Sequence, residues 1–271
     1  MMQFNLTLSL PDKQNRVLPV NYQYPLSAWI YKTIHQGNHE FAEFLHSKGF
    51  ALGERTFKFF TFSRLQFPDH GFHITGDRMH IDANTIQLRI SFLVPEAMQH
   101  FVSGLFKNQQ FELGDKISRV AFVISSIEAQ SIPCFTGTMT FRTLSPIVIS
   151  HHIEDVKTAA FIAPDDERYE QFITDNLTNK YLAAMQSGLV SQRIDFNNDH
   201  QGVRFKLLGK TKMNGIFIKA GTPQQTKIIG YLFDFQITAP TELIRIGYYA
   251  GFGEKNSLGM GSCRCLASSI R

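Results

Sequence analysis

The sequence has little cysteine and no regular cysteine pattern. It contains three cysteines, Cys134, Cys263 and Cys265, and none belongs to a Cys-x-x-Cys pair. Cys263 and Cys265 would point to the same face of a strand, too far apart along it for an easy bridge. So sparse a set argues against a disulfide scaffold and a structural zinc site, and it indicates a reducing compartment.

Long hydrophobic runs are also missing. No apolar stretch approaches the roughly 20 residues that a helix needs to cross a membrane. Residues 1–17 begin with the alternation of a strand and lack the features of a signal peptide. We therefore expect a cytoplasmic protein that has no membrane partner.

Neither sign of charge predominates strongly, whereas phenylalanine is abundant. The formal net charge of +4 is compatible with a polyanionic partner such as RNA or DNA, but it is not evidence for one. There are 25 phenylalanines and one tryptophan. Many of these phenylalanines alternate with polar residues, as at 56–63 and 136–143, and this period of two is typical of sheet surfaces.

The first half of the chain has the hydrophobic pattern of a small α+β unit. Ser27 is a suitable N-cap for the first helix, and Asn38 is a suitable N-cap for the second. The predicted elements are a strand at 3–10, helices at 27–34 and 39–48, strands near 56–63, 72–75 and 86–93, a helix at 95–108, and strands near 110–114 and 117–127. This order contains the β-α-β-β-α-β sequence of a ferredoxin-like unit.

The second half repeats that order after the connecting residues 128–134. The predicted elements are a strand at 137–150, a helix at 165–185, strands near 203–209, 213–219 and 228–237, a short helix that opens at Pro240, and a strand at 262–268. We therefore predict an α+β fold of two tandem ferredoxin-like domains, residues 1–130 and 135–271. The fold is duplicated, although the sequence is not.

The densest glycine segment of the chain, residues 251–261, fits neither common nucleotide-binding motif. A dinucleotide fingerprint needs a third glycine where Asn256 stands, and a Walker loop needs Lys-Ser or Lys-Thr where Gly259 is followed by Met260. What remains is a loop whose glycines permit positive φ and close backbone approach to a partner. The alternative interpretation is a plain tight turn between a helix and an edge strand.

Residues 247–264, GYYAGFGEKNSLGMGSCR, resemble the C-terminal glycine-rich loop of a known family. This is the Cas-six family of CRISPR-associated repeat-processing endoribonucleases, in the RAMP superfamily. Three further blocks, residues 18–34, 44–50 and 141–149, resemble other segments of that family and occur in the family's order. In the loop itself the matching positions are Gly251, Gly253, Asn256, Ser257, Gly259, Met260 and Gly261.

The resemblance implies two tandem ferredoxin-like domains and an endoribonuclease that needs no metal and no cofactor. Such enzymes cut CRISPR repeat RNA to release guide RNAs. The ribose 2′-OH attacks the adjacent phosphorus, which leaves a 2′,3′-cyclic phosphate and a 5′-OH. The reaction needs a base, an acid and a group that stabilises the charged phosphorane. DNA is not cut because it lacks the 2′-OH nucleophile.

The resemblance also assigns three catalytic positions. His46 corresponds to the general base, or to part of a base and acid pair. Tyr31 corresponds to the residue that holds or protonates the scissile group, and Lys58 to the cation that neutralises the phosphate. His39 is the second choice for the base, and His35 is a further alternative.

Each assignment has a structural alternative. His46 could be a surface histidine beside an apolar stripe, Tyr31 a core aromatic, and Lys58 a solvated lysine. The connection between His46 and Lys58 is long, so Lys48 or Arg55 could replace Lys58. A zinc site on the neighbouring histidines is not expected, because no HExxH pattern or third ligand is present.

RNA binding is expected at two places. The glycine-rich loop can present backbone N–H groups to phosphates, together with the charge of Lys255. The second place is a basic segment, residues 204–212, expected to form a hairpin near that loop; its alternative role is a solvated edge that deters aggregation. The expected RNA-binding residues are Gly251, Gly253, Lys255, Asn256, Ser257, Gly259, Gly261, Arg204, Lys206, Lys210 and Lys212.

The expected partner is CRISPR repeat RNA, single-stranded or folded as a hairpin. Two other functions stay open. One is a RAMP subunit of a CRISPR effector complex that binds RNA without cutting it, and the other is a ferredoxin-like protein that binds a small molecule. The sequence leaves open whether the protein is a monomer or a homodimer.

Overall fold

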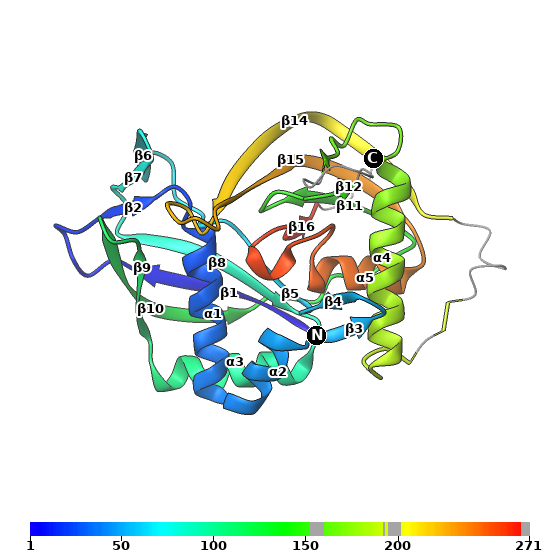
Figure 1. Ribbon diagram of the computed structural model, residues 1–271, viewed down its shortest axis with the longest axis horizontal. Helices are drawn as coiled ribbons and strands as arrows, with labels where there is room; N and C mark the ends of the chain where they lie inside the picture. The colour runs from blue at the N-terminus through cyan, green and yellow to red at the C-terminus, as the bar shows by residue number, and fades with distance from the viewer. Residues whose placement is uncertain (152–159, 192, 195–201, 267–271) are drawn as a thin grey trace.

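The computed structural model describes residues 1–151, 160–191, 193–194 and 202–266. Figure 1 shows the N-terminal half, blue to green, at the lower left, and most of the C-terminal half at the upper right. The segment between the last helix and the last strand lies at the centre of the view, between the two halves. The end of the predicted strand at 262–268 falls outside the described residues.

The N-terminal half is built on a five-stranded antiparallel sheet in the order β5-β8-β1-β10-β9. Three helices accompany it, and α1 and α3 pack closely because Gly37 and Gly104 allow the two backbones to meet. The elements are β1 (Met2–Ser9), α1 (Gln23–Gly37), α2 (His39–Ser47), β5 (Phe60–Phe62), β8 (Thr85–Phe92), α3 (Pro95–Lys107), β9 (Gln110–Gly114) and β10 (Arg119–Ala129).

The C-terminal half is built on a four-stranded antiparallel sheet in the order β14-β15-β11-β16. Its elements are β11 (Thr138–Thr143), α4 (Tyr169–Gln186), β14 (Arg204–Ile218), β15 (Thr226–Thr238), α5 (Thr241–Ala250), the 3₁₀ turn η1 (Asn256–Leu258) and β16 (Cys263–Cys265). If each unit's four core strands are numbered along the chain, both sheets have the order 2-3-1-4, with helices after the first and third strands. This is a tandem ferredoxin-like fold, as the sequence predicts.

Three smaller sheets complete the described structure. β2 (Val17–Pro19), β7 (Arg78–Ile81) and β6 (Phe72–Thr75) form one; β3 (Phe50–Leu52) pairs with β4 (Arg55–Phe57), and β12 (Ser150–His151) pairs with β13 (Ala160–Phe161). The β3–β4 ribbon belongs to the N-terminal half, yet it contacts α4 of the other half (Figure 1). This ribbon therefore brings the two halves together at one edge of the molecule.

Several predicted elements differ from the observed ones. The expected strand at 56–63 is broken at Phe59, whose φ of 52° ends β4 and starts β5 in another sheet. The expected hairpin at 204–212 is wrong: β14 runs through it as one strand with irregular register between Leu208 and Lys212, and its hairpin partner is β15. Helix α1 begins at Gln23, so Ser27 lies inside the helix and does not cap it. The expected strand at 137–150 divides into β11 and β12.

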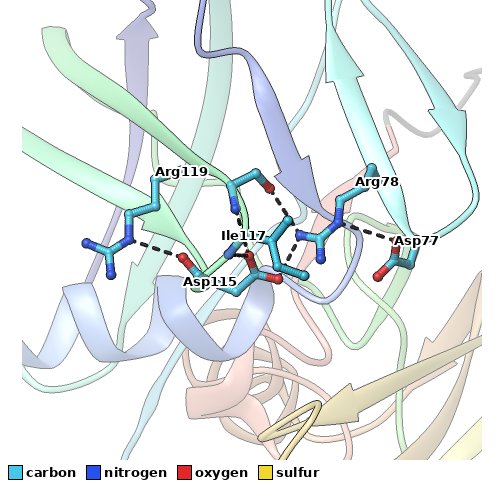
Figure 2. Close-up of polar contacts among 6 residues, drawn as sticks. Asp77, Arg78, Asp115, Ile117 and Arg119 are labelled. Carbon is cyan, nitrogen blue, oxygen red and sulfur yellow. Dashed lines mark hydrogen bonds and ion pairs between the residues drawn. The ribbon is translucent and has the colours of Figure 1, made fainter.

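An ion-pair network ties the β6–β7 hairpin to the turn between β9 and β10. The guanidinium of Arg78 donates to Asp115 at 2.7 Å and to the Ser118 hydroxyl at 3.0 Å. Figure 2 shows the Asp115 carboxylate also accepting from the backbone N–H of Ile117, while Arg119 donates to the Asp115 carbonyl. One carboxylate thus organises both its own turn and the contact with β7.

The two halves share a continuous apolar core. Buried residues of β1, β8, β11, β15 and α5 belong to one cluster. Polar contacts cross the same boundary: the Tyr248 hydroxyl donates to Gln3 at 2.8 Å, and the backbone N–H of Phe217 donates to Asn21 at 2.9 Å. A site that draws residues from both halves therefore has a fixed geometry.

Candidate active site

Helices α1 and α2 bring Tyr31 and His46 together. Asn38 ends α1 and caps α2, since its side chain accepts from the backbone N–H of Phe41 at 2.9 Å. Phe41 and Leu45 anchor α2 in the core, which leaves His46 on the exposed side. The rings of Tyr31 and His46 meet edge to face, with centroids 5.4 Å apart.

The phenol of Tyr31 is a proton donor under ordinary conditions. Burial raises the pKa of Tyr31 to about 12, although a hydrogen bond with the Ser257 side chain opposes the shift. The ring also packs against Phe60 at 5.3 Å. Because the hydroxyl stays protonated at neutral pH, it can donate to an oxygen but cannot serve as a base.

Lys58 lies beside the end of α2. Its ammonium donates to the carbonyl of His46 at 2.9 Å, a favourable place for a cation because α2 ends there. Burial lowers the pKa of Lys58. The bond uses one of the three N–H donors of the ammonium, so two remain for other acceptors.

The glycine-rich loop, which we define as residues 251–261, is fastened to the N-terminal half. The hydroxyl of Ser27 in α1 donates to the Ser257 carbonyl at 2.6 Å, and the hydroxyl of Thr61 in β5 donates to the Met260 carbonyl at 2.8 Å. Within the loop, the amide of Asn256 donates to the Met260 carbonyl at 3.0 Å. Ser27 was expected as a cap; its observed partner is the loop.

The glycines of this loop are explained by contacts inside the protein. Gly251, Gly253, Gly259 and Gly261 all have positive φ, between 70° and 92°. A Cβ on Gly259 would run into the ring of Phe62, and one on Gly261 would run into a backbone carbonyl. These glycines therefore serve close packing inside the protein, and that of Gly259 is against the N-terminal half, whatever the loop also binds.

Three consecutive backbone N–H groups of the loop make no hydrogen bond within the described part of the chain. Among the described residues, no acceptor meets the N–H of Lys255, Asn256 or Ser257. The N–H groups that follow, at Leu258 and Gly259, bond within the turn. Lys255 itself has φ of 56° and is exposed. Adjacent free N–H groups of this kind are suited to holding an anion.

A cavity of about 700 Å³ lies between the glycine-rich loop, α4, β12 and residues 55–59. Its ionisable side chains are mainly basic: Arg55, Lys58, Lys180 and Lys255 against Asp175 and Glu254, with His151 beside them. Tyr31 and His46 lie just outside its lining. They are joined to it through Ser257, which bonds to Tyr31, and through Lys58, which bonds to the carbonyl of His46.

Comparison with known proteins identifies the family. Residues 128–265 match the family model described as CRISPR associated protein Cas6, C-terminal, and residues 17–128 match that of CRISPR-associated protein Cas6, N-terminal. The chain belongs to the Cas6 family. The two matches together cover both halves of the fold and include Tyr31, His46 and the whole glycine-rich loop.

Curated relatives and solved structures of Cas6 proteins agree with this. CRISPR-associated endoribonuclease Cas6 1 of Methanocaldococcus jannaschii is 28% identical over 258 residues, covering 94% of this chain and 90% of that protein. CRISPR-associated endoribonuclease Cas6 of Pyrococcus furiosus is 29% identical over 265 residues, covering 96% and 88%. A structure described as CRISPR associated protein Cas6 superposes with a TM-score of 0.72 at 28% identity, covering 98% of this chain and 99% of the other.

The structure of this Cas6 family member places several other predicted residues outside the cavity lining. His39 pairs with Glu43 at 3.4 Å, and its ring meets that of His35 edge to face with centroids 4.5 Å apart; neither histidine lines the cavity. Of the alternatives to Lys58, Arg55 lines the cavity and Lys48 does not. The basic residues of β14 were expected near the loop, but none of Arg204, Lys206, Lys210 and Lys212 lines the cavity.

Sequence reasoning missed several residues of the site. Thr61 and Lys180 both bind carbonyls of the glycine-rich loop, and His151 lines the cavity. No local pattern singles these residues out, because each partner is distant in sequence. In the part of the chain that the structure describes, no three His, Cys, Asp or Glu side chains gather as metal ligands. No helix there is long and apolar enough to cross a membrane.

Proposed function

We propose that this protein is a metal-independent endoribonuclease that cleaves CRISPR repeat RNA and releases guide RNAs. The observation that carries the proposal is the contact of Tyr31 with both His46 and the glycine-rich loop, at the side of a cation-rich cavity. The curated Cas6 relatives, whose names describe endoribonucleases, support the same activity.

His46 is the proposed general base. Its imidazole is exposed, so it can reach a ribose 2′-OH and exchange protons with solvent. The deprotonated 2′ oxygen attacks the adjacent phosphorus, and the bond from phosphorus to the 5′ oxygen breaks. The products are a 2′,3′-cyclic phosphate and a 5′-OH.

Tyr31 and Lys58 are proposed to serve the charged transition state. The phenol of Tyr31 remains protonated, so it can donate to the leaving 5′ oxygen or to a phosphoryl oxygen. The ammonium of Lys58 keeps two N–H donors for the phosphorane oxygens while it holds the end of α2. Both residues are fixed by contacts that exist before any RNA binds.

The glycine-rich loop is proposed to position the phosphate. The free N–H groups of Lys255, Asn256 and Ser257 can receive phosphoryl oxygens, and the side chain of Lys255 adds a positive charge. Ser257 also bonds to Tyr31, so a phosphate held by the loop would lie close to the proposed acid. The exposed cations of β14, which lie elsewhere, are proposed to hold RNA flanking the cut.

The proposal is tested by incubating the purified protein with its repeat RNA in excess EDTA. We expect cleavage at one position, and mass spectrometry should find a 2′,3′-cyclic phosphate on the upstream fragment and a 5′-OH on the downstream one. An uncut RNA that remains bound would instead support an RNA-binding subunit without activity. An RNA that neither binds nor is cut would overturn both functions.

A further inference from the structure

Lys180 is a buried lysine behind the glycine-rich loop. Its residue is 2% exposed, and among the described residues it is the one lysine buried to this degree. Its Nζ donates to the carbonyl of Gly251 at 2.5 Å and to the carbonyl of Gly253 at 2.6 Å. It also forms part of the wall of the 700 Å³ cavity. No step of the proposed reaction uses it.

The loop is therefore held from two opposite sides. Ser27 and Thr61 of the N-terminal half bind the carbonyls of Ser257 and Met260. Lys180 binds the start of the loop from α4 of the C-terminal half. If Lys180 were removed, no side chain of α4 would donate to the carbonyls of Gly251 and Gly253. The loop, including Ser257 beside Tyr31, would then be held only by Ser27 and Thr61 of the N-terminal half.

We propose that Lys180 is a positioning residue for RNA cleavage, and that it gains a proton when an RNA phosphate enters the cavity. The inference rests on the proposed function of this cavity. A neutral amine has two N–H donors, which match the two carbonyls, whereas an ammonium has a third donor that meets no acceptor among the described residues. The free protein can thus hold the loop with an uncharged lysine.

Burial lowers the pKa of Lys180 to about 7, and the charge of Glu254 opposes that shift. A phosphate in the cavity adds negative charge, which favours the ammonium and raises the pKa of Lys180. RNA binding then takes up a proton at a pH above 7, and affinity falls as the pH rises through that window, by at most about tenfold per pH unit. The ionisable groups that share the cavity wall with Lys180 are Asp175 of α4, Glu254 and Lys255 of the loop, His151 of β12, and Arg55 and Lys58 of the N-terminal half.

The titration is measured on the wild-type protein, and a variant is needed only to assign the resonance. Lysine ¹³Cε chemical shifts are followed against pH, with and without a repeat RNA that carries a 2′-deoxyribose at the cut and cannot be cleaved. The resonance that vanishes in Lys180→Arg identifies the residue. We expect the Lys180 midpoint to rise by at least about one pH unit when RNA binds. An unchanged titration midpoint for Lys180 would show that the residue takes up no proton when RNA binds.

The positioning role is measured with Lys180→Met, whose side chain has a similar length and no donor. We expect kcat for repeat cleavage to fall about tenfold or more, with KM changed less, and Lys180→Arg to recover part of the loss. The matched control is Lys107→Met, which removes an exposed lysine of α3 that donates to the Gln36 carbonyl of α1, and it should leave cleavage unchanged. A folded Lys180→Met variant with the wild-type kcat would contradict the positioning role and leave the proposed function intact. A wild-type protein that does not cut repeat RNA would contradict the proposed function itself.

Discussion

At the scale of single residues, the surroundings of each side chain decide what chemistry it can do. Tyr31 is partly buried and stays protonated, which suits an acid and a hydrogen-bond donor. His46 follows the buried Leu45 and is exposed, which suits a group that exchanges protons with solvent. Lys58 is fixed by the carbonyl of His46. The proposed division of roles follows from these three environments.

Replacing His46 by alanine should stop the chemistry and spare the binding. A positioned acid or base contributes about 100-fold or more to the rate, so the cleavage rate constant under single-turnover conditions should fall at least that far. Affinity for the repeat RNA, measured by filter binding, should stay within a few-fold. His39→Ala is the matched control and should cleave normally; a dead His39→Ala beside an active His46→Ala would move the base to His39.

Replacing Tyr31 by phenylalanine isolates the phenol. The ring contacts with His46 and Phe60 remain, so the thermal midpoint should change little, since one lost hydrogen bond costs about 1 kcal/mol. The cleavage rate should fall roughly 10- to 100-fold because a donor to the transition state is gone. Ser257→Ala removes the partner of the Tyr31 phenol and keeps the phenol itself, so its cleavage rate should fall less than tenfold. An equal fall in rate in both variants would mean that the Tyr31 hydroxyl acts only by holding the loop.

At the scale of elements, the glycine-rich loop is a packing device as well as a proposed phosphate site. Its glycines allow it to pass between Phe62 of β5 and the backbone near Val148. Its carbonyls receive hydroxyl donors from α1 and β5. A mutation in this loop therefore changes stability and RNA binding together, and stability has to be measured alongside any loss of activity.

Gly259→Ala should destabilise the protein through contact with the Phe62 ring as well as through backbone strain. We expect a loss of about 2–3 kcal/mol in the free energy of unfolding, measured by urea denaturation. Gly76→Ala is the control, because Gly76 also has positive φ but an added Cβ would meet nothing within 4 Å. Gly76→Ala should lose only about 1 kcal/mol of the free energy of unfolding, because backbone strain is its single cost. Equal losses of stability in the two variants would show that the contact with Phe62 does not contribute to the cost.

The Arg78 network makes a prediction about stability away from the site. Arg78→Met removes the bonds to Asp115 and Ser118 and should cost about 1–2 kcal/mol, because the guanidinium is largely buried. Arg119→Met is the control; its side chain is 65% exposed, so its loss should stay within a few tenths of a kcal/mol. Both variants are compared by thermal denaturation. Equal midpoints would show that the bonds of Arg78 to Asp115 and Ser118 do not stabilise the fold.

At the scale of the whole molecule, two similar units enclose one site. The N-terminal half supplies Tyr31, His46 and Lys58, and the C-terminal half supplies the loop and α4. Contacts such as Ser27 with Ser257 cross between them, so neither half has the complete arrangement alone. This division explains why the proposed chemistry needs the full chain.

The sequence predicted the tandem fold because apolar periodicity and cap residues such as Asn38 are local signals. It failed where the deciding contact was distant. Phe59 adopts a positive φ that its residue type disfavours, so the break beside Lys58 was not foreseeable. Residues 204–212 were expected to form a hairpin of their own, yet β15 pairs with β14 on both sides of the irregular register between Leu208 and Lys212. Lys180 resembles an ordinary helix lysine until the loop, about 70 residues later, folds against it.

In the proposed mechanism, one scissile phosphate meets residues of both halves. This arrangement is tested most directly by a crystal structure of the protein with its repeat RNA, carrying a 2′-deoxyribose at the cut. We predict that the scissile phosphate lies within hydrogen-bond reach, about 3 Å, of the loop N–H groups at Asn256 and Ser257. The 2′ position should face His46. A phosphate bound on another surface, with Tyr31, His46 and the loop untouched by RNA, would contradict the account.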